Sequence, residues 1–135
     1  MKRIYEALKH SVALAPASVA ASTETATAFV DAAGVREVEF LISAAALGSG
    51  KKLKVGVYTS DAAAGTDAVL VQEQEFAAGD GNACLAVVSY RVAAERGRYV
   101  GVKFQHDAAA AVVCGVTASV LVQELPAEND WTLVV

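Results

Sequence analysis

Apolar residues at every second position of residues 96–124 are the feature that most constrains the fold. In the first half of this stretch, Val100, Val102 and Phe104 fall on one face of an extended chain. The second half repeats the pattern with Val112, Cys114, Val116, Ala118, Val120 and Val122. A period of two with β-branched residues on one face is typical of a strand with a buried side. We therefore predict two long strands joined as a hairpin by a turn at residues 106–110, the second strand being central and covered on both faces.

Similar patterns recur along the chain between turn residues. Strand-like stretches occupy residues 25–30, 35–43, 51–60, 68–76 and 84–92. The strongest alternates Val38, Phe40 and Ile42 with glutamates. Asp80-Gly81, between the last two stretches, is a hairpin signal. About six or seven strands at spacings of roughly ten to twenty residues predict an all-β fold, an antiparallel β-sandwich that is jelly-roll-like.

The composition fits one domain with a packed core. The chain has 135 residues, of which 55% are hydrophobic. Its net charge of −4 argues against a nucleic-acid-binding protein, which would carry a basic stripe. The apolar runs are shorter than the roughly 18 residues of a membrane span, so we expect neither a nucleic acid nor a membrane as partner. A secretory signal at residues 11–21 is not expected, because Pro16 interrupts a short apolar run.

We divide the chain into an N-terminal arm (1–23), a β-sandwich domain (24–124) and a C-terminal arm (125–135). Residues 1–12 form either a short helix or an extended segment, because so short a helix is marginal on its own. The C-terminal arm carries the only Trp and ends in apolar residues, so it docks on its own domain or is offered to a neighbour. The predicted partner-binding residues lie in both arms: Ile4, Tyr5, Leu8, Trp131, Leu133, Val134 and Val135.

The titratable residues do not form a catalytic or metal-binding pattern. His10 and His106 are the only histidines, and no second pair of ligands stands at metal-site spacing from His106-Asp107. We expect that pair on the surface, as part of a turn. The loop aspartates fit no EF-hand spacing and are expected to be solvated turn residues: Asp61, Asp67 and Asp80. The sequence therefore predicts no catalytic residue, no metal and no cofactor, and thus no enzyme.

The two cysteines, Cys84 and Cys114, both stand in apolar strand patterns. We expect them to be buried and chemically inert, because a thiol in apolar surroundings forms little thiolate. A disulfide between them requires neighbouring strands with facing side chains.

Charges are unevenly distributed along the chain. The N-terminus is basic (Lys2, Arg3 and Lys9), and the last segment is acidic (Glu124, Glu128 and Asp130). Six further cations stand on or beside strands: Lys51, Lys52, Lys54, Arg91, Arg96 and Arg98. We expect these cations to lie on the solvent faces of strands, although together they could form a patch that meets an acidic protein partner.

Several short fragments occur here in an order similar to that of a class of small proteins from the head modules of tailed phages and prophages. They are an alanine- and proline-containing arm, a strand ending in Val30-Asp31 with Gly34 after it, and a strand closing on Ser60-Asp61. An Arg98-Tyr99-Val100 strand and an Ala/Val-rich final strand follow. The resemblance covers about residues 13–125, and the tail 126–135 is not part of it.

The resemblance implies a virion structural protein, most plausibly a capsid decoration or cement protein on the lattice of the major capsid protein. Such a protein would be made in the bacterial host cytoplasm and end up on the capsid surface. We also expect self-association as a dimer or trimer, because the domain is small for its apolar content and carries two arms. The alternative is a carbohydrate-binding module or a tail or adhesin module, with Trp131 and Tyr58 as the obvious stacking platforms.

Overall fold

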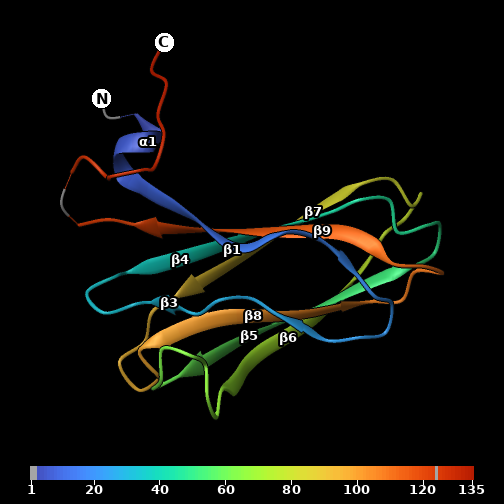
Figure 1. Cartoon of the computed structure of the whole chain (residues 1–135). Coiled ribbons are helices and arrows are strands. Elements are labelled where there is room, and N and C mark those ends of the chain that lie inside the picture. Colours follow the sequence, from blue (N-terminus) through green and yellow to red (C-terminus); the bar gives the residue numbers. More distant parts are fainter. Residues whose placement is uncertain (1–2, 124) are drawn as a thin grey trace.

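The structure, a computed structural model, describes residues 3–123 and 125–135. Residues 1–2 of the predicted N-terminal arm and Glu124, the last residue of the predicted domain, lie outside the described residues. Two antiparallel sheets pack face to face (Figure 1). In chain order the elements are α1 (Ile4–Ala7), β1 (Leu8–Val19), β2 (Thr25–Ala26), β3 (Val30–Asp31), β4 (Glu37–Ala44), β5 (Lys52–Ser60), β6 (Val69–Ala77), β7 (Cys84–Arg91), β8 (Tyr99–His106) and β9 (Val112–Leu121).

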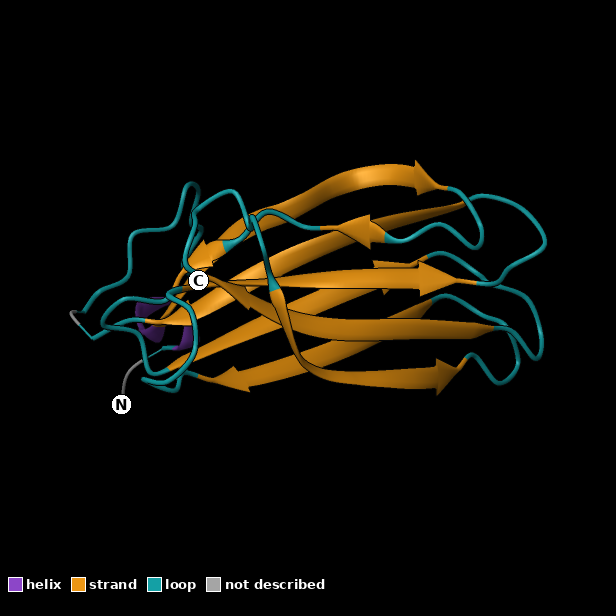
Figure 2. Cartoon of the chain, turned by 90° about the horizontal axis from the view of Figure 1, so that it is seen from below, coloured by secondary structure: helices purple, strands orange, loops and turns teal. Residues whose placement is uncertain are grey.

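The strands alternate between the two sheets. One sheet, here called the β9 sheet, has the order β1-β9-β4-β7, and the other, the β5 sheet, has the order β2-β8-β5-β6 with β3 also paired to β8. Apart from β2–β3 and β5–β6, every connection between successive strands crosses from one sheet to the other. The loops gather at the two ends of the sandwich (Figure 2). The prediction of an all-β, jelly-roll-like antiparallel sandwich is confirmed.

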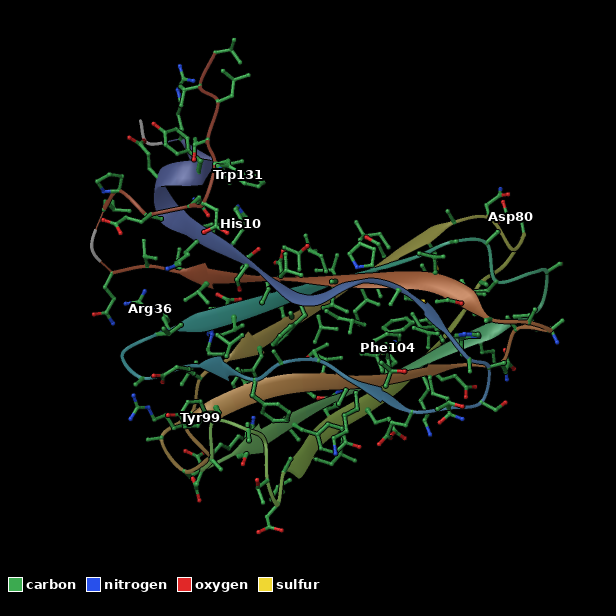
Figure 3. The ribbon with its side chains drawn as sticks, viewed as in Figure 1. His10, Arg36, Asp80, Tyr99, Phe104 and Trp131 are labelled. Atoms are coloured by element: carbon green, nitrogen blue, oxygen red, sulfur yellow. The ribbon has the colours of Figure 1, made fainter. Side chains whose placement is uncertain are left out.

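The inward faces of the central strands are those that the alternation indicates. Val38, Phe40 and Ile42 on β4 are fully buried against the alternate residues of β5, β8 and β9. Phe104 lies between the two sheets (Figure 3). Small and β-branched side chains supply most of this core, so the two sheets can pack closely.

Both predicted hairpins are wrong. β8 and β9, joined by the turn at 106–110, belong to opposite sheets, and so do β6 and β7, joined through Asp80-Gly81. A turn signal specifies a local reversal of the chain, but the sheet that the next strand joins depends on which neighbours cover its buried face. β9 is central, between β1 and β4, as predicted. Its outer face is not covered, because Val113 there is 53% exposed.

The turn around Gly81 binds the loop between β4 and β5 instead of forming a hairpin. Gly48 N–H donates to the Gly81 carbonyl and Gly50 N–H to the Gly79 carbonyl, each at 3.3 Å. Gly81 has a φ of +82°, and a Cβ there would lie 2.4 Å from the Gly48 carbonyl carbon. A glycine is required at this position, and the two loops close one end of the sandwich together.

Most of the predicted N-terminal arm is a strand of the sandwich. β1 pairs along β9, from Leu8 opposite Leu121 to Val19 opposite Val112. Pro16 sits at an irregularity in this pairing, between Leu14 and Ala17, which an edge strand tolerates because its outer N–H groups need no partner. Among the described residues of this arm, 4–7 are helical. The boundary predicted at residue 23 therefore does not separate an arm from the sandwich.

His106 is buried, so the prediction of an exposed turn pair with Asp107 is wrong for the histidine. Its side chain is 1% exposed, and its Nε2 lies 2.8 Å from the Val19 carbonyl oxygen. Ala108 N–H donates to its Nδ1 at 3.2 Å, so Nε2 carries the proton that Val19 accepts. The imidazole thus ties the end of β1 to the crossover between β8 and β9.

Replacing His106 with Ala should destabilise the fold by about 2–4 kcal/mol, because it leaves a cavity and two backbone groups without partners. His10→Ala is the matched control, since His10 is exposed and makes one side-chain contact, to Ser119 Oγ. It should cost about 1 kcal/mol or less. Urea unfolding of the two variants measures the difference. Equal losses would contradict the structural role of His106.

Candidate functional site

The two ends of the chain lie together and project from one end of the sandwich. This terminal projection comprises residues 3–7 and 125–135 and stands beside the end of β1 (Figures 1 and 3). Ala127 N–H donates to the Glu6 carbonyl at 2.8 Å, and Val122 N–H to the Ala7 carbonyl at 3.0 Å. The structure therefore brings the N-terminal and C-terminal predicted partner-binding residues into one body.

Asn129 holds the projection together, and the sequence analysis missed it. Its Nδ2 donates to the carbonyls of Tyr5 at 3.2 Å and Leu8 at 3.0 Å, and its Oδ1 accepts from His10 N–H at 2.7 Å. One amide thus satisfies backbone groups where α1 ends and β1 begins. A lone Asn in a polar segment gives no sequence signal for this role.

The predicted partner-binding residues differ in exposure. Trp131 is 96% exposed, Leu133 88% and Val135 101%, and Ile4 is exposed as well. Val134 is less exposed, and Tyr5 and Leu8 are half-buried, with their carbonyls bound to Asn129. The apolar side chains of the tail are therefore free for contact with another molecule, whereas Tyr5 and Leu8 also serve the projection itself.

A second apolar surface lies on the outer face of the β9 sheet. The register places Val12, Thr117, Leu41 and Val87 side by side across all four strands, and we call this line the apolar row. Val12 is 69% exposed and Val87 54%, and two more large apolar side chains nearby are exposed, Leu85 and Val113. The sequence analysis missed this surface because it used the alternation only to find the buried face of each strand.

The outer face of the β5 sheet is polar instead. Lys52 Nζ lies 3.1 Å from Glu75 Oε1, and the Lys103 ammonium lies over the Tyr58 ring at 4.5 Å from its centroid. Exposed pairs of this kind contribute little to stability but keep a face in water. The outer face of the β9 sheet also carries polar residues, among them Glu37, Glu39 and Ser89, so the two outer faces differ in the presence of the apolar row.

The sandwich is open along one side, between the free edges of β6 and β7. A groove of about 350 Å³ lies there, here called the edge groove. Its apolar lining includes Val55, Val57, Val71 and Val88, and its polar lining includes Gln72, Glu73, Gln74, Tyr90, Arg91 and Arg96. A further hollow of about 270 Å³ lies between the same two strands, lined by Leu47, Phe76, Cys84 and their neighbours. This groove was not predicted either.

The six cations considered as one patch are divided among different sites. Lys52 pairs with Glu75, and Lys54 lies opposite Glu75 in the register of β5 and β6. Arg98 pairs with Asp31, whereas Arg91 and Arg96 line the edge groove. The predicted basic patch is therefore reduced to two arginines, Arg91 and Arg96, beside the edge groove.

The fragments that carried the family resemblance meet at one corner of the β5 sheet. Asp31 lies opposite Tyr99 in the register and accepts two hydrogen bonds from the Arg98 guanidinium, at 2.8 and 2.7 Å, which hold the pKa of this carboxyl at about 2. Ser60 also lies opposite Tyr99, and a Cβ on Gly97 would come within 2.6 Å of the Ser60 backbone. These residues support the fold, because each contact joins neighbouring strands or their turns.

The two thiols have different environments. Cys114 is 1% exposed, and burial raises its pKa, with a smaller contribution from nearby Cys84. Cys84 is half-buried and lines the second hollow between β6 and β7, so its predicted burial is wrong. In the register, Ala44 of β4 lies between Cys84 of β7 and Cys114 of β9. The two cysteines are therefore two strands apart, and both are free thiols. At roughly 10 Å, that separation is too large for a disulfide.

Two other kinds of site are absent from the described residues. Within residues 3–123 and 125–135, no three His, Cys, Asp or Glu side chains form a group able to hold a metal ion. In the same part of the chain, no helix is long and apolar enough to span a membrane.

Comparison with solved structures identifies sandwiches of the same fold. The PBSX exported protein XepA matches with a TM-score of 0.61 and 14% identity over 93% of this chain, which spans only 41% of that protein. A chain of the cowpea mosaic virus top component matches with a TM-score of 0.52 and 7% identity, over 100% of this chain and 92% of that one. A chain of infectious bursal disease virus, Gx strain, matches with a TM-score of 0.50 and 11% identity, over 85% of this chain and 31% of that one.

No protein-family model and no curated sequence matches the chain. At these identities the structural matches establish the fold alone, since one fold serves many functions. The chain is a β-sandwich of the kind found in viral capsid proteins.

Native-state thiol labelling should modify one cysteine per chain. Cys84 should react in buffer, and Cys114 only after denaturant is added, because a buried thiol with a raised pKa forms little thiolate. Mass spectrometry after maleimide treatment identifies the labelled residue. The Cys84→Ser variant should show no native labelling, and rapid modification of Cys114 in that variant would contradict its burial.

Proposed function

We propose that this chain is a virion structural protein, a capsid decoration or cement protein that binds the lattice of the major capsid protein. The observation that carries the proposal is the apolar row on the outer face of the β9 sheet. Val12 and Val87 at its two ends are more than half exposed. Contiguous exposed apolar side chains on a rigid surface are typical of a protein–protein contact.

The contrast between the two outer faces supports an orientation on the capsid. The outer face of the β9 sheet, which carries the apolar row with Glu37 and Glu39 beside it, would lie against the lattice, and the outer face of the β5 sheet would face solvent. A flat, four-stranded surface fits a broad protein partner better than a small ligand, because a small-molecule site is concave. The fold shared with chains of viral capsids is consistent with this role and does not by itself establish it.

In this proposal the protein acts without catalysis and is carried on the capsid surface after synthesis in the bacterial host cytoplasm. The terminal projection is a second contact surface, with Ile4, Trp131, Leu133 and Val135 exposed. Self-association as a dimer or trimer would bury part of this area.

One observation favours a different class of function. Trp131 and Tyr5 border a hollow in the terminal projection, together with His10 and Asn129. An exposed aromatic ring beside polar groups is the usual platform of a sugar site, so a carbohydrate-binding or adhesin module is the second candidate. A glycan array with the Trp131→Ala variant as control distinguishes it: binding that disappears in the variant would favour this candidate.

Co-sedimentation with empty phage heads tests the capsid proposal. Val12→Glu should weaken binding at least about tenfold, because it places a charge within an apolar contact, on the most exposed apolar side chain of the row. Leu70→Glu is the matched control, since Leu70 is a 45% exposed apolar residue of β6, opposite Tyr58 on the outer face of the β5 sheet. Thermal unfolding checks that both variants fold. Unchanged binding of Val12→Glu, or equal weakening by both variants, would overturn the proposed orientation.

A further inference from the structure

The edge groove has the geometry of a site for an extended peptide. β6 and β7 are the last strands of their sheets on this side, so in the described part of the chain their outer backbone groups have no strand partner. The floor of the groove between them is formed by alternate apolar residues of β5 and β7, with Val55 and Val57 buried and Val88 half-buried. An added strand could pair with a free edge and direct every second side chain onto this floor.

Tyr90 provides independent evidence that the groove accepts a ligand. Its side chain is 5% exposed, and its buried hydroxyl has no hydrogen-bond partner among the described residues. A buried hydroxyl without a partner is costly, and a backbone carbonyl or amide arriving in the groove would satisfy it. Beside it, Arg96 lies over the Tyr90 ring at 5.9 Å, and Arg91 adds a second positive charge. The groove lining contains one carboxylate, Glu73, against these two arginines, so its net charge is positive. The occupant should therefore be extended, apolar and flanked by acidic residues.

The tail of this chain has those properties. Trp131, Leu133 and Val135 are apolar at alternate positions and are the most exposed of its large apolar side chains. Glu128 and Asp130 precede them, and residues 126–135 contain no Lys or Arg. Five residues of strand span about 16 Å, comparable to the half of β7 that borders the groove.

The tail of one chain does not face its own groove. It leaves the sandwich next to β1, and β1 and β7 are the two opposite edges of the β9 sheet. Asn129 anchors it there through Tyr5, Leu8 and His10. Occupation of the groove without breaking these hydrogen bonds therefore requires a second copy.

We propose that residues 130–135 of one copy bind as an added strand in the edge groove of a second copy. The contact is heterologous, so a pair of bound copies still offers one free groove and one free tail, and the assembly is an open chain or a closed ring. Trp131 and Leu133 lie on the apolar floor, and Asp130 approaches Arg91 and Arg96. This inference does not depend on capsid binding.

Sedimentation velocity of the full chain over a concentration series tests it. Self-association should weaken at least about tenfold in the truncated chain 1–129, which keeps Asn129, and in the double variant Arg91→Glu/Arg96→Glu. The matched control is Lys54→Glu/Lys103→Glu, which makes the same change in charge on the outer face of the β5 sheet. Trp131, the only Trp, should shift its emission to shorter wavelength as the full chain associates.

Mixing the variants separates this contact from one between two tails. The truncated chain keeps its groove and the Arg91→Glu/Arg96→Glu chain keeps its tail, so an equimolar mixture should form a one-to-one complex that neither forms alone. Adding Glu128→Lys and Asp130→Lys to the groove variant should restore its self-association. A monomeric full chain at high micromolar concentration, undiminished association of the truncated chain, or failure of the mixture to form a complex would each overturn the proposal.

Discussion

The structure depends on the burial of one face of each central strand against the opposite sheet. β4, β5, β8 and β9 bury alternate residues almost completely, and the hydrophobic effect fixes both their orientation and their register. A shift of one residue in any of these strands would bring its polar face into the core. The edge strands are less constrained, and there the sandwich carries its irregular features: Pro16 in β1, the open side between β6 and β7, and the attached projection.

Alternation in the sequence was sufficient to predict the strands, the inward residues and the all-β class, because a period of two is a local property. The sheet that each strand joins is a non-local property, and the two predicted hairpins were wrong for that reason. β1 was predicted to be part of an arm because Pro16 and the small residues of this segment give little alternation of polar and apolar residues. The sequence predicted His106 on the surface. Its distant backbone partner, Val19, comes next to it and Ala108 only in the fold, where β1 ends beside the crossover between β8 and β9.

The candidate contact surfaces were predicted only in part. An apolar tail is evident in the sequence, so Trp131 and Leu133 were predicted as binding residues; the structure leaves both side chains exposed, and their role in binding stays a prediction. The apolar row and the edge groove combine residues from several strands. In the sequence these residues are far apart, and only the register of the sheet places Val12 in line with Val87. Arg91 and Arg96 were noticed as cations, but their position beside Tyr90 follows from the fold alone.

A cryo-electron microscopy reconstruction of empty heads incubated with the truncated chain 1–129 is the most direct measurement of the proposed role, because removal of the tail excludes the self-association proposed here. The account predicts density for the sandwich on the capsid surface, with the outer face of the β9 sheet against the lattice and Lys52 and Lys103 of the β5 sheet toward solvent. Contact through the β5 sheet, or heads without added density at saturating protein, would contradict it.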